Sequence, residues 1–549
     1  MPNVRPEMRV GYILLIFLFA GFLLLPLTAL LIRSFETSSG FNLSNYLVVL
    51  LNKEMMNSIG NSFKVSSATA VITTILAFTL AYSINCTRIY QPLKRVMGTV
   101  MILPMLLPTI TYGFAIMYSF GNQGLLTKIF GKGFFEIYGF NGLLIGYVIY
   151  TLPAAFLLIN NSFKYIDKKF IVVSKLMGDG AVRSFANTIV RPLIGTLGGA
   201  FVLSFILSFT DFGIPASVGG TYSVVSTQLY QVMLGSIPDF NHGAVIAVLM
   251  LLPAVLGIFL LYFLEKFNFQ YEKITDIEWS KNTYRDTFLA IISSLILLGM
   301  LSIFAVMFIA PFLNSFPYNL TFTFKHISTV IQSSDLVAVY KNSVAVASLT
   351  AIAGTVIAYS SAILNVRTRL KGRFAIDIIS MITNTVPGMV LGLSYLLLFN
   401  GSSLKGTFII IILCNIIHYF TTPYLMAKNS LSKMNRSWET TGELLGDSWM
   451  KTIYRVILPN SVSTVIEMFS YYFINSMVTI SGVIFLVTAQ TSLVASKIKE
   501  LQHFAKFNEI FVLSLLIFFT NLLMKLLCDY LQKRKAVHVK KIDRKREAA

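Results

Sequence analysis

Long apolar runs, separated by shorter polar segments, make up most of the chain. Twelve of these runs are long enough to cross the hydrocarbon core of a bilayer, which takes about 20 apolar residues. We predict spans at residues 12–32, 64–84, 97–119, 142–160, 193–212, 243–264, 287–311, 343–364, 376–399, 406–426, 461–486 and 509–531. The pattern therefore predicts an all-α polytopic membrane protein with about twelve transmembrane helices.

Composition supports this interpretation and narrows the chemistry. Of 549 residues, 55% are hydrophobic and 12% are charged, whereas a soluble domain carries about 25% charged residues. The three cysteines lie in or beside apolar runs without metal-type spacing, so we expect no metal site. The sequence contains no GxxxxGK[ST] loop and no HExxH, paired-cysteine or Ser/His/Asp arrangement, so we expect no catalytic centre in this chain.

Basic residues predict how the spans are oriented. The net charge is +20, and cytoplasmic loops of membrane proteins carry an excess of Lys and Arg. If the N-terminus is cytoplasmic, the basic segments that fall inside are 88–95, 164–191, the segment after 265, 367–373, 428–455 and the tail 532–549. The main exceptions are Lys497, Lys499 and Lys506 in the last outer loop. We expect a multi-pass protein of the cell membrane with both termini in the cytoplasm. Its basic tail is suited to anionic lipid and not to nucleic acid.

The chain contains an internal duplication. The run that begins at Asn61 resembles the run that begins at Asn342, 281 residues later, and the two segments ending at Gly178 and Gly446 are 268 residues apart. Each copy includes six predicted spans, so both copies have the same orientation in the membrane. We predict four parts: a first domain 1–264 with a polar loop 163–192, a linker 265–286, a second domain 287–531 with a polar loop 428–459, and a basic tail 532–549.

The two polar loops contain the same sequence motif, here called the phrase. It reads SKLMGDGAVRSFANTIVRP at 174–192 and GELLGDSWMKTIYRVILPN at 442–460. In each, a helical stretch runs to a glycine, Gly178 or Gly446, which favours the left-handed turn that ends a helix. Asp179 or Asp447, and in the second copy Ser448, can then cap the next helix. The phrase therefore predicts a short helix–turn–helix, which we call a knuckle.

The second helix of each predicted knuckle is amphipathic. Its apolar face holds Val182, Phe185 and Ile189 in the first copy and Trp449, Ile453 and Val456 in the second, where Lys451 and Arg455 share another face. Pro192 and Pro459 then mark a turn into the fifth span of each half. A single loop of this kind would be taken for a connector, but two copies at equivalent places favour a function.

The phrase resembles the Glu-Ala-Ala–Gly–spacer–Leu-Pro loop of type I ATP-binding cassette importer permeases, and each half looks like one such permease domain. The distance from Gly446 to Leu458-Pro459 has the family's spacing, whereas the first copy has one extra residue before Pro192 and has Arg191 in place of Leu. Neither copy has Glu-Ala-Ala in register, since Glu439 comes one place early.

The resemblance implies that each knuckle docks on a separate ATPase, that two copies of this ATPase carry ATP-Mg, and that an extracytoplasmic binding protein delivers a small solute. The residues that it assigns to the coupling loops are Lys175, Leu176, Met177, Gly178, Asp179, Phe185, Pro192, Glu443, Leu444, Leu445, Gly446, Asp447, Trp449 and Pro459. Fused permeases of this kind resemble the group that imports iron(III), 2-aminoethylphosphonate, thiamine or related solutes such as polyamines.

Polar residues within the fifth spans are candidates for the translocation pathway, because ionisable groups in a bilayer are costly and are commonly functional. They are Asp211, Glu467 and Asn475. A hydrogen-bonded structural role is the alternative for each. An alternative for the whole chain is an ion-gradient-driven transporter with twelve spans in two halves, such as the major facilitator superfamily. That family has a Gly/Asp/Arg-rich motif between its second and third spans, whereas this loop reads NCTRIYQPLKR.

Overall fold

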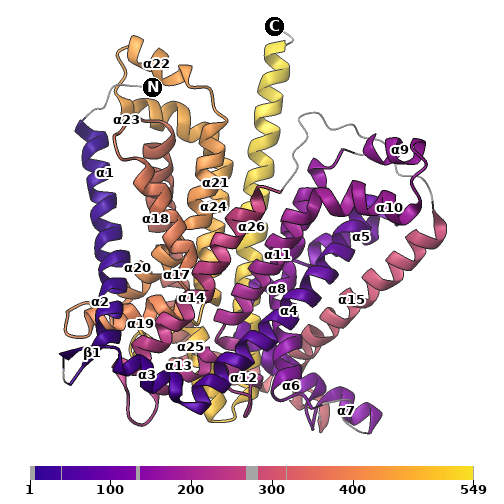
Figure 1. The fold of residues 1–549 in the computed structure, drawn as a ribbon, viewed down its shortest axis with the longest axis vertical. Coiled ribbons are helices and arrows are strands. Elements are labelled where there is room, and N and C mark those ends of the chain that lie inside the picture. The colour runs from indigo at the N-terminus through magenta and orange to yellow at the C-terminus, as the bar shows by residue number, and fades with distance from the viewer. Residues whose placement is uncertain are drawn as a thin grey trace.

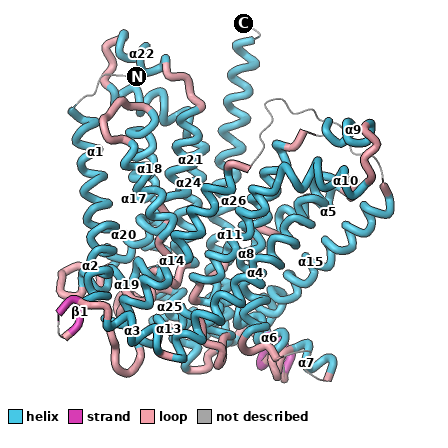
Figure 2. The backbone as a smooth tube through the Cα atoms, viewed as in Figure 1, coloured by secondary structure: helices cyan, strands magenta, loops and turns pink. Residues whose placement is uncertain are grey.

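Helices form most of the computed structural model, as predicted, and the two short hairpins are its only strands among the residues described (Figures 1 and 2). The structure describes residues 6–547 except 39, 132–135, 168, 268–281 and 317. Most of the predicted linker 265–286 therefore lies outside the described residues. Helix α26 (Phe507–Glu547) continues from the last predicted span through most of the predicted tail.

The elements of the first half are α1 (Pro6–Phe19), η1 (Ala20–Leu24), α2 (Leu25–Phe35), β1 (Glu36–Thr37), β2 (Gly40–Phe41), α3 (Ser44–Leu51), α4 (Lys53–Cys86), α5 (Gln91–Val100), η2 (Leu103–Leu106), α6 (Thr109–Phe120), α7 (Leu125–Phe130), α8 (Phe140–Ser162), η3 (Phe163–Tyr165), α9 (Lys169–Leu176), α10 (Ala181–Phe185), η4 (Ala186–Val190), α11 (Arg191–Thr210), α12 (Gly213–Val218), α13 (Val225–Leu234) and α14 (Phe240–Glu265). Strands β1 and β2 pair antiparallel, with Glu36 opposite Phe41.

The second half follows the same order with α15 (Thr283–Ile309), η5 (Ala310–Phe312), β3 (Leu313–Ser315), β4 (Asn319–Phe322), α16 (Lys325–Gln332), α17 (Ser334–Val366), α18 (Phe374–Thr385), α19 (Gly388–Phe399), α20 (Phe408–His418), α21 (Thr421–Ser432), α22 (Ser437–Leu444), α23 (Trp449–Thr452), η6 (Ile453–Ile457), α24 (Leu458–Val478), α25 (Val494–His503) and α26. Strands β3 and β4 pair antiparallel, with Leu313 opposite Phe322.

Eight helices in the described part of the chain are long and apolar enough to cross a membrane, or eleven if each of three bent helix pairs is one span. They cover every predicted span except 461–486. Helix α24 occupies that place but ends at Val478, and it includes the polar residues Glu467 and Asn475. The repeat nevertheless makes α24 the counterpart of α11.

Three predicted spans are broken and not straight. The pairs bend by 108° within 91–128, by 103° within 374–399 and by 53° within 408–432. Two of the breaks fall at prolines, since Pro108 immediately precedes α6 and Pro387 immediately precedes α19. The residue before each proline, Leu107 or Val386, has an extended backbone, as expected from the clash that proline makes with a preceding helical residue.

The first helix of each half packs against the other half. On one side α2 contacts α19 and α1 contacts α17, and Tyr12 and Tyr395 donate hydrogen bonds of 2.7 and 2.5 Å to the carbonyls of Gly372 and Phe22. On the other side α15 contacts α4 and α6. This exchange joins the halves into one body.

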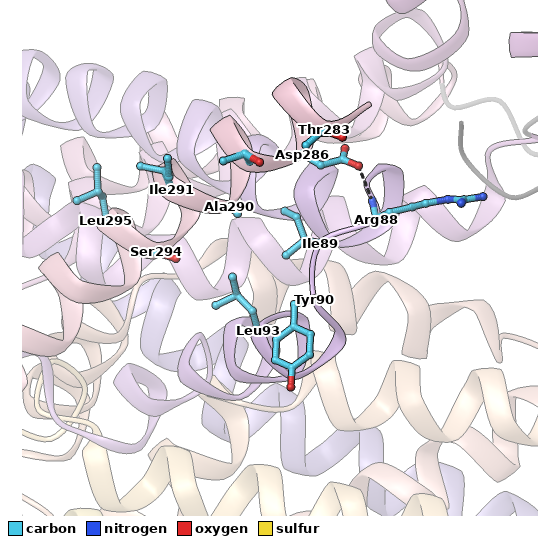
Figure 3. Close-up of a pocket in the computed structure, with 11 residues that line it drawn as sticks. Arg88, Ile89, Tyr90, Leu93, Thr283, Asp286, Ala290, Ile291, Ser294 and Leu295 are labelled. Atoms are coloured by element: carbon cyan, nitrogen blue, oxygen red, sulfur yellow. Dashed lines mark hydrogen bonds between the residues drawn. The ribbon is translucent and has the colours of Figure 1, made fainter. Parts of the chain in front are cut away.

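A pocket lies beside α15 where this helix meets the first half. It has a volume of about 760 Å³ and lies between α15 and the segment 88–93 (Figure 3). At one end of the pocket the Asp286 carboxylate accepts a 3.2 Å hydrogen bond from the backbone N–H of Arg88, and Ile291 and Leu295 line the apolar part.

Both termini, α9 and α10, and α22 and α23 all lie at one end of the molecule, while α3, α12, α13 and the α6–α7 corner lie at the other (Figure 1). The duplicated polar loops therefore project from the same end.

Candidate functional site

The two knuckles share one turn geometry, which the glycines make possible. Gly178 and Gly446 have φ of +77° and +74°, a region that L side chains rarely adopt. In each turn a backbone N–H donates to the carbonyl five residues earlier, from Asp179 to Ser174 at 3.1 Å and from Asp447 to Gly442 at 2.9 Å. This is the Schellman arrangement, which satisfies the last carbonyls of α9 and α22.

Large apolar side chains just before these glycines face outward. Leu176 and Met177 are 83% and 78% exposed, and their equivalents Leu444 and Leu445 are 83% and 75% exposed. Two more exposed apolar residues, Val182 and Met450, extend the surface onto the following helices. We call these six residues the knuckle surface. Five of them lie outside the helices that are long and apolar enough to cross a membrane, and Val182 lies at the start of the helical stretch 181–210.

Capping of the following helices differs from the prediction. Ser448 does cap α23, because its hydroxyl accepts a 3.2 Å hydrogen bond from the N–H of Lys451. The prediction that the aspartates cap was wrong. Asp447 pairs with the side chain of Lys451, and Asp179 instead accepts from the Ser174 hydroxyl at 2.7 Å and pairs with Arg183. The residue at the start of α10 is Gly180, which has no side chain to cap with.

The predicted turn at Pro192 and Pro459 is also absent. A five-residue π-helical segment, η4 or η6, joins each knuckle helix directly to the fifth helix, and residues 181–210 form one continuous span. Proline has no N–H to donate to the preceding turn, and a π-helical bulge absorbs the resulting mismatch without ending the helix. The second helix of each knuckle, α10 or α23, is therefore continuous with α11 or α24.

Aromatic residues fasten the knuckles to the body of the protein. Trp449 is 7% exposed, and Phe185 packs edge-on against Tyr82 of α4, with ring centroids 5.5 Å apart. Ile189 is buried as predicted, but Val182, assigned to the same apolar face, is 83% exposed. The apolar face of the first knuckle is thus only partly used for internal packing.

A buried ion pair anchors the second knuckle, and the sequence analysis missed it. Arg367 at the end of α17 and Glu439 in α22 are 1% and 4% exposed, and the guanidinium donates to both carboxylate oxygens. Arg367 also donates to the carbonyls of Met434 and Asn435 at 2.9 and 2.8 Å. The displaced Glu439 was the available signal, but its partner lies 72 residues away in sequence.

The three predicted pathway residues do not form one cluster of contacts. The Asp211 carboxylate is buried and accepts a 2.9 Å hydrogen bond from the N–H of Ile214, so it holds the start of α12. Asn475 donates to the carbonyl of Tyr471 within α24 at 2.8 Å. Glu467 is exposed on α24. Asp211 thus has the structural role named as its alternative, and a pathway role for all three stays a prediction.

Two homologous helical halves, each with an equivalent knuckle before its fifth helix, define a duplicated permease of the type I importer class. The sequence profile of the family described as "binding-protein-dependent transport system inner membrane component" matches residues 74–270 and 354–537, once in each half. The chain belongs to this family, which confirms the resemblance found in the sequence.

Proteins named for ferric transport are similar over most of the chain. A putative ferric transport system permease protein of Haemophilus influenzae, FbpB 1, is 26% identical over 87% of this chain and 77% of its own length. The ferric transport system permease protein FbpB of Actinobacillus pleuropneumoniae is 25% identical over 87% of this chain and 71% of its own length. A probable sulfate transport system permease protein, cysT of Helicosporidium, is 28% identical over 35% of this chain and 72% of its own length.

Proposed function

We propose that the two knuckles are the docking sites through which a pair of ATPase subunits drives this permease. Each knuckle docks on one ATPase copy, ATP-Mg is bound and hydrolysed there, and closure of the ATPases moves the two halves between inward-facing and outward-facing states. The observation that carries the proposal is the knuckle surface, repeated at the same offset and projecting from one end. Large apolar side chains exposed outside the bilayer mark a protein interface.

The continuous helix that joins each knuckle to a fifth helix supports this proposal. A displacement at the knuckle is transmitted along α11 or α24 without an intervening hinge, since the π-helical segments keep the helices continuous. In this account the knuckle end, with both termini, faces the cytoplasm. The opposite end receives solute from an extracytoplasmic binding protein.

Iron(III) is the solute that we propose first. The two relatives that match 87% of the chain are both named for ferric transport. The sulfate-transport relative matches about one third of the chain and so represents a single half. Membership of a binding-protein-dependent family argues against the ion-gradient alternative.

Replacement of the two turn glycines tests the coupling proposal. An added Cβ at Gly178 or Gly446 meets no atom within 4 Å, so the effect of Gly178→Val or Gly446→Val comes from the left-handed backbone alone. That strain is roughly 1–2 kcal/mol. Each variant is expected to lower the amount of ATPase that co-purifies and the vanadate-sensitive hydrolysis in proteoliposomes with binding protein.

Gly401→Val is the matched control, because Gly401 is equally open and has no positive φ. It should retain the bound ATPase and its activity. Uptake that runs on an ion gradient and ignores vanadate would contradict the proposal.

A further inference from the structure

A lysine sits at the contact between the halves, at the end opposite the knuckles. Lys499 lies in α25, which follows the fifth helix of the second half, and it is half-buried. Its ammonium donates a 3.1 Å hydrogen bond to the carbonyl of Ala216 in α12, which follows the fifth helix of the first half. Gln502 donates to the same carbonyl at 3.2 Å. These bonds close the two halves on each other just beyond α11 and α24.

Helix α13 is the counterpart of α25 and shows what is particular to this lysine. The first N–H of each helix is held by an equivalent serine, Ser62 for α13 at 2.9 Å and Ser343 for α25 at 2.8 Å. One turn later, Gln228 of α13 contacts Glu54 at 2.7 Å, as Lys497 of α25 contacts Asp335 at 3.0 Å. The two halves thus share the serine contact at the start of the helix and the polar contact one turn later.

Two residues further along α13 and α25 the halves differ. The first half has Tyr230, whose ring lies 4.9 Å from that of Phe212, where the second half has the charge of Lys499. The fold of this helix therefore does not require a charged side chain at the position of Lys499.

The charge of Lys499 is not neutralised. Its two hydrogen-bond acceptors are the Ala216 carbonyl and the Gln502 amide oxygen, at 3.1 and 2.9 Å, and both are neutral. Among the described residues it forms no ion pair, while Glu500 beside it pairs with Lys497 at 2.7 Å. Burial lowers the pKa of Lys499 to about 8. A half-buried ammonium with neutral partners gains most from an anionic oxygen, since charge-assisted hydrogen bonds are about twice as strong as neutral ones.

We propose that Lys499 recognises an anionic group of the transported solute at the outer end of the interface, so the species carried is an anion or a metal complex of net negative charge. This inference rests on the proposed import function and deepens it. While the halves are closed, Lys499 is held on the Ala216 carbonyl. When they separate, that carbonyl withdraws and the incoming anionic oxygen takes its place, whereas a cation such as a polyamine is repelled.

The test is uptake into proteoliposomes that hold the full chain with its ATPase and saturating binding protein, with ferric citrate, sulfate and spermidine as probes. Lys499→Gln should lower uptake of an anionic probe by about tenfold, the loss of one hydrogen bond to a charged group. Lys499→Arg should restore most of it. Lys497→Gln, on the same helix but ion-paired, should remain close to the original chain.

Gln502→Leu distinguishes recognition of the anion by Lys499 from a role of these hydrogen bonds in holding the two halves together. It removes a neutral bond to the same carbonyl and one neutral acceptor of Lys499 but keeps the charge of Lys499, so it should spare anion uptake if charge is what matters. The inference is overturned if Gln502→Leu lowers uptake as much as Lys499→Gln, if Lys499→Gln has no effect, or if no anionic probe is carried. Vanadate-sensitive ATP hydrolysis measured in parallel reports the import function itself, so a failure of that function is distinguishable from a failure of this inference.

Discussion

The two knuckles are equivalent in sequence position and in turn geometry, yet they are fastened to the protein in different ways. The second is held by the buried pair of Arg367 and Glu439. At the same offsets of 281 and 268 residues, the first half has Cys86 and Ile171, two uncharged residues. The first knuckle is held instead by aromatic packing, since Phe185 of α10 contacts aromatic side chains of α4. The exposed apolar surface is the part that both copies keep.

This difference indicates which features the function requires. Both members of the ion pair are absent together from the first half, so the pair is one of two interchangeable anchors. Burying an ion pair has a desolvation cost that often equals or exceeds the attraction between the charges, and apolar replacements of similar size are commonly tolerated. The glycine turn and the knuckle surface have no such substitute, which is why we assign the coupling role to them.

The largest expected effect comes from breaking the anchor on one side. Arg367→Met leaves the Glu439 carboxylate buried without its partner, at a cost of about 3–5 kcal/mol. The melting temperature of the purified permease should fall markedly. The double variant Arg367→Cys with Glu439→Ile, which installs the first half's residues, should recover much of that loss. Thermal unfolding in detergent measures both. A double variant no more stable than Arg367→Met would show that the anchors are not interchangeable.

A smaller effect is expected at the helix caps. Ser448→Ala removes the hydroxyl that caps α23 and should destabilise the second knuckle by about 1 kcal/mol. In the first knuckle the corresponding cap is Gly180, and Gly180→Ser should have a small stabilising effect of a few tenths of a kcal/mol. Hydrogen exchange at 449–452 and 181–185 reports each change separately. Equal exchange before and after Ser448→Ala would contradict the capping role.

The sequence was sufficient where the information is local or repeated. The duplication, the turn glycines and the Ser448 cap depend on residues close together or on one fixed offset. The bends at Pro108 and Pro387 were not predicted, because hydropathy measures apolar length and not direction. The exchange of first helices was not foreseen, since it depends on how the whole chain packs.

Predictions for the capping aspartates failed for a related reason. Asp179 and Asp447 have the right position for a cap, but a lysine or arginine one turn later competes for each carboxylate. The carboxylate of Asp211, which was singled out as an ionisable residue in a span, is used to begin α12, and its role in the pathway stays a prediction. Proximity in sequence identifies the candidate partners of a carboxylate, and only the folded chain selects among them.

Protection of the knuckle surface from labelling tests the coupling account most directly. The native cysteines are buried, so Leu176→Cys and Leu444→Cys can each be labelled with a polar maleimide in the permease alone and in its complex with the ATPase. Ile237→Cys, 88% exposed at the opposite end, is the control. The account predicts that both knuckle positions become protected in the complex while position 237 does not. Knuckle cysteines that label equally fast with the ATPase still bound would contradict it.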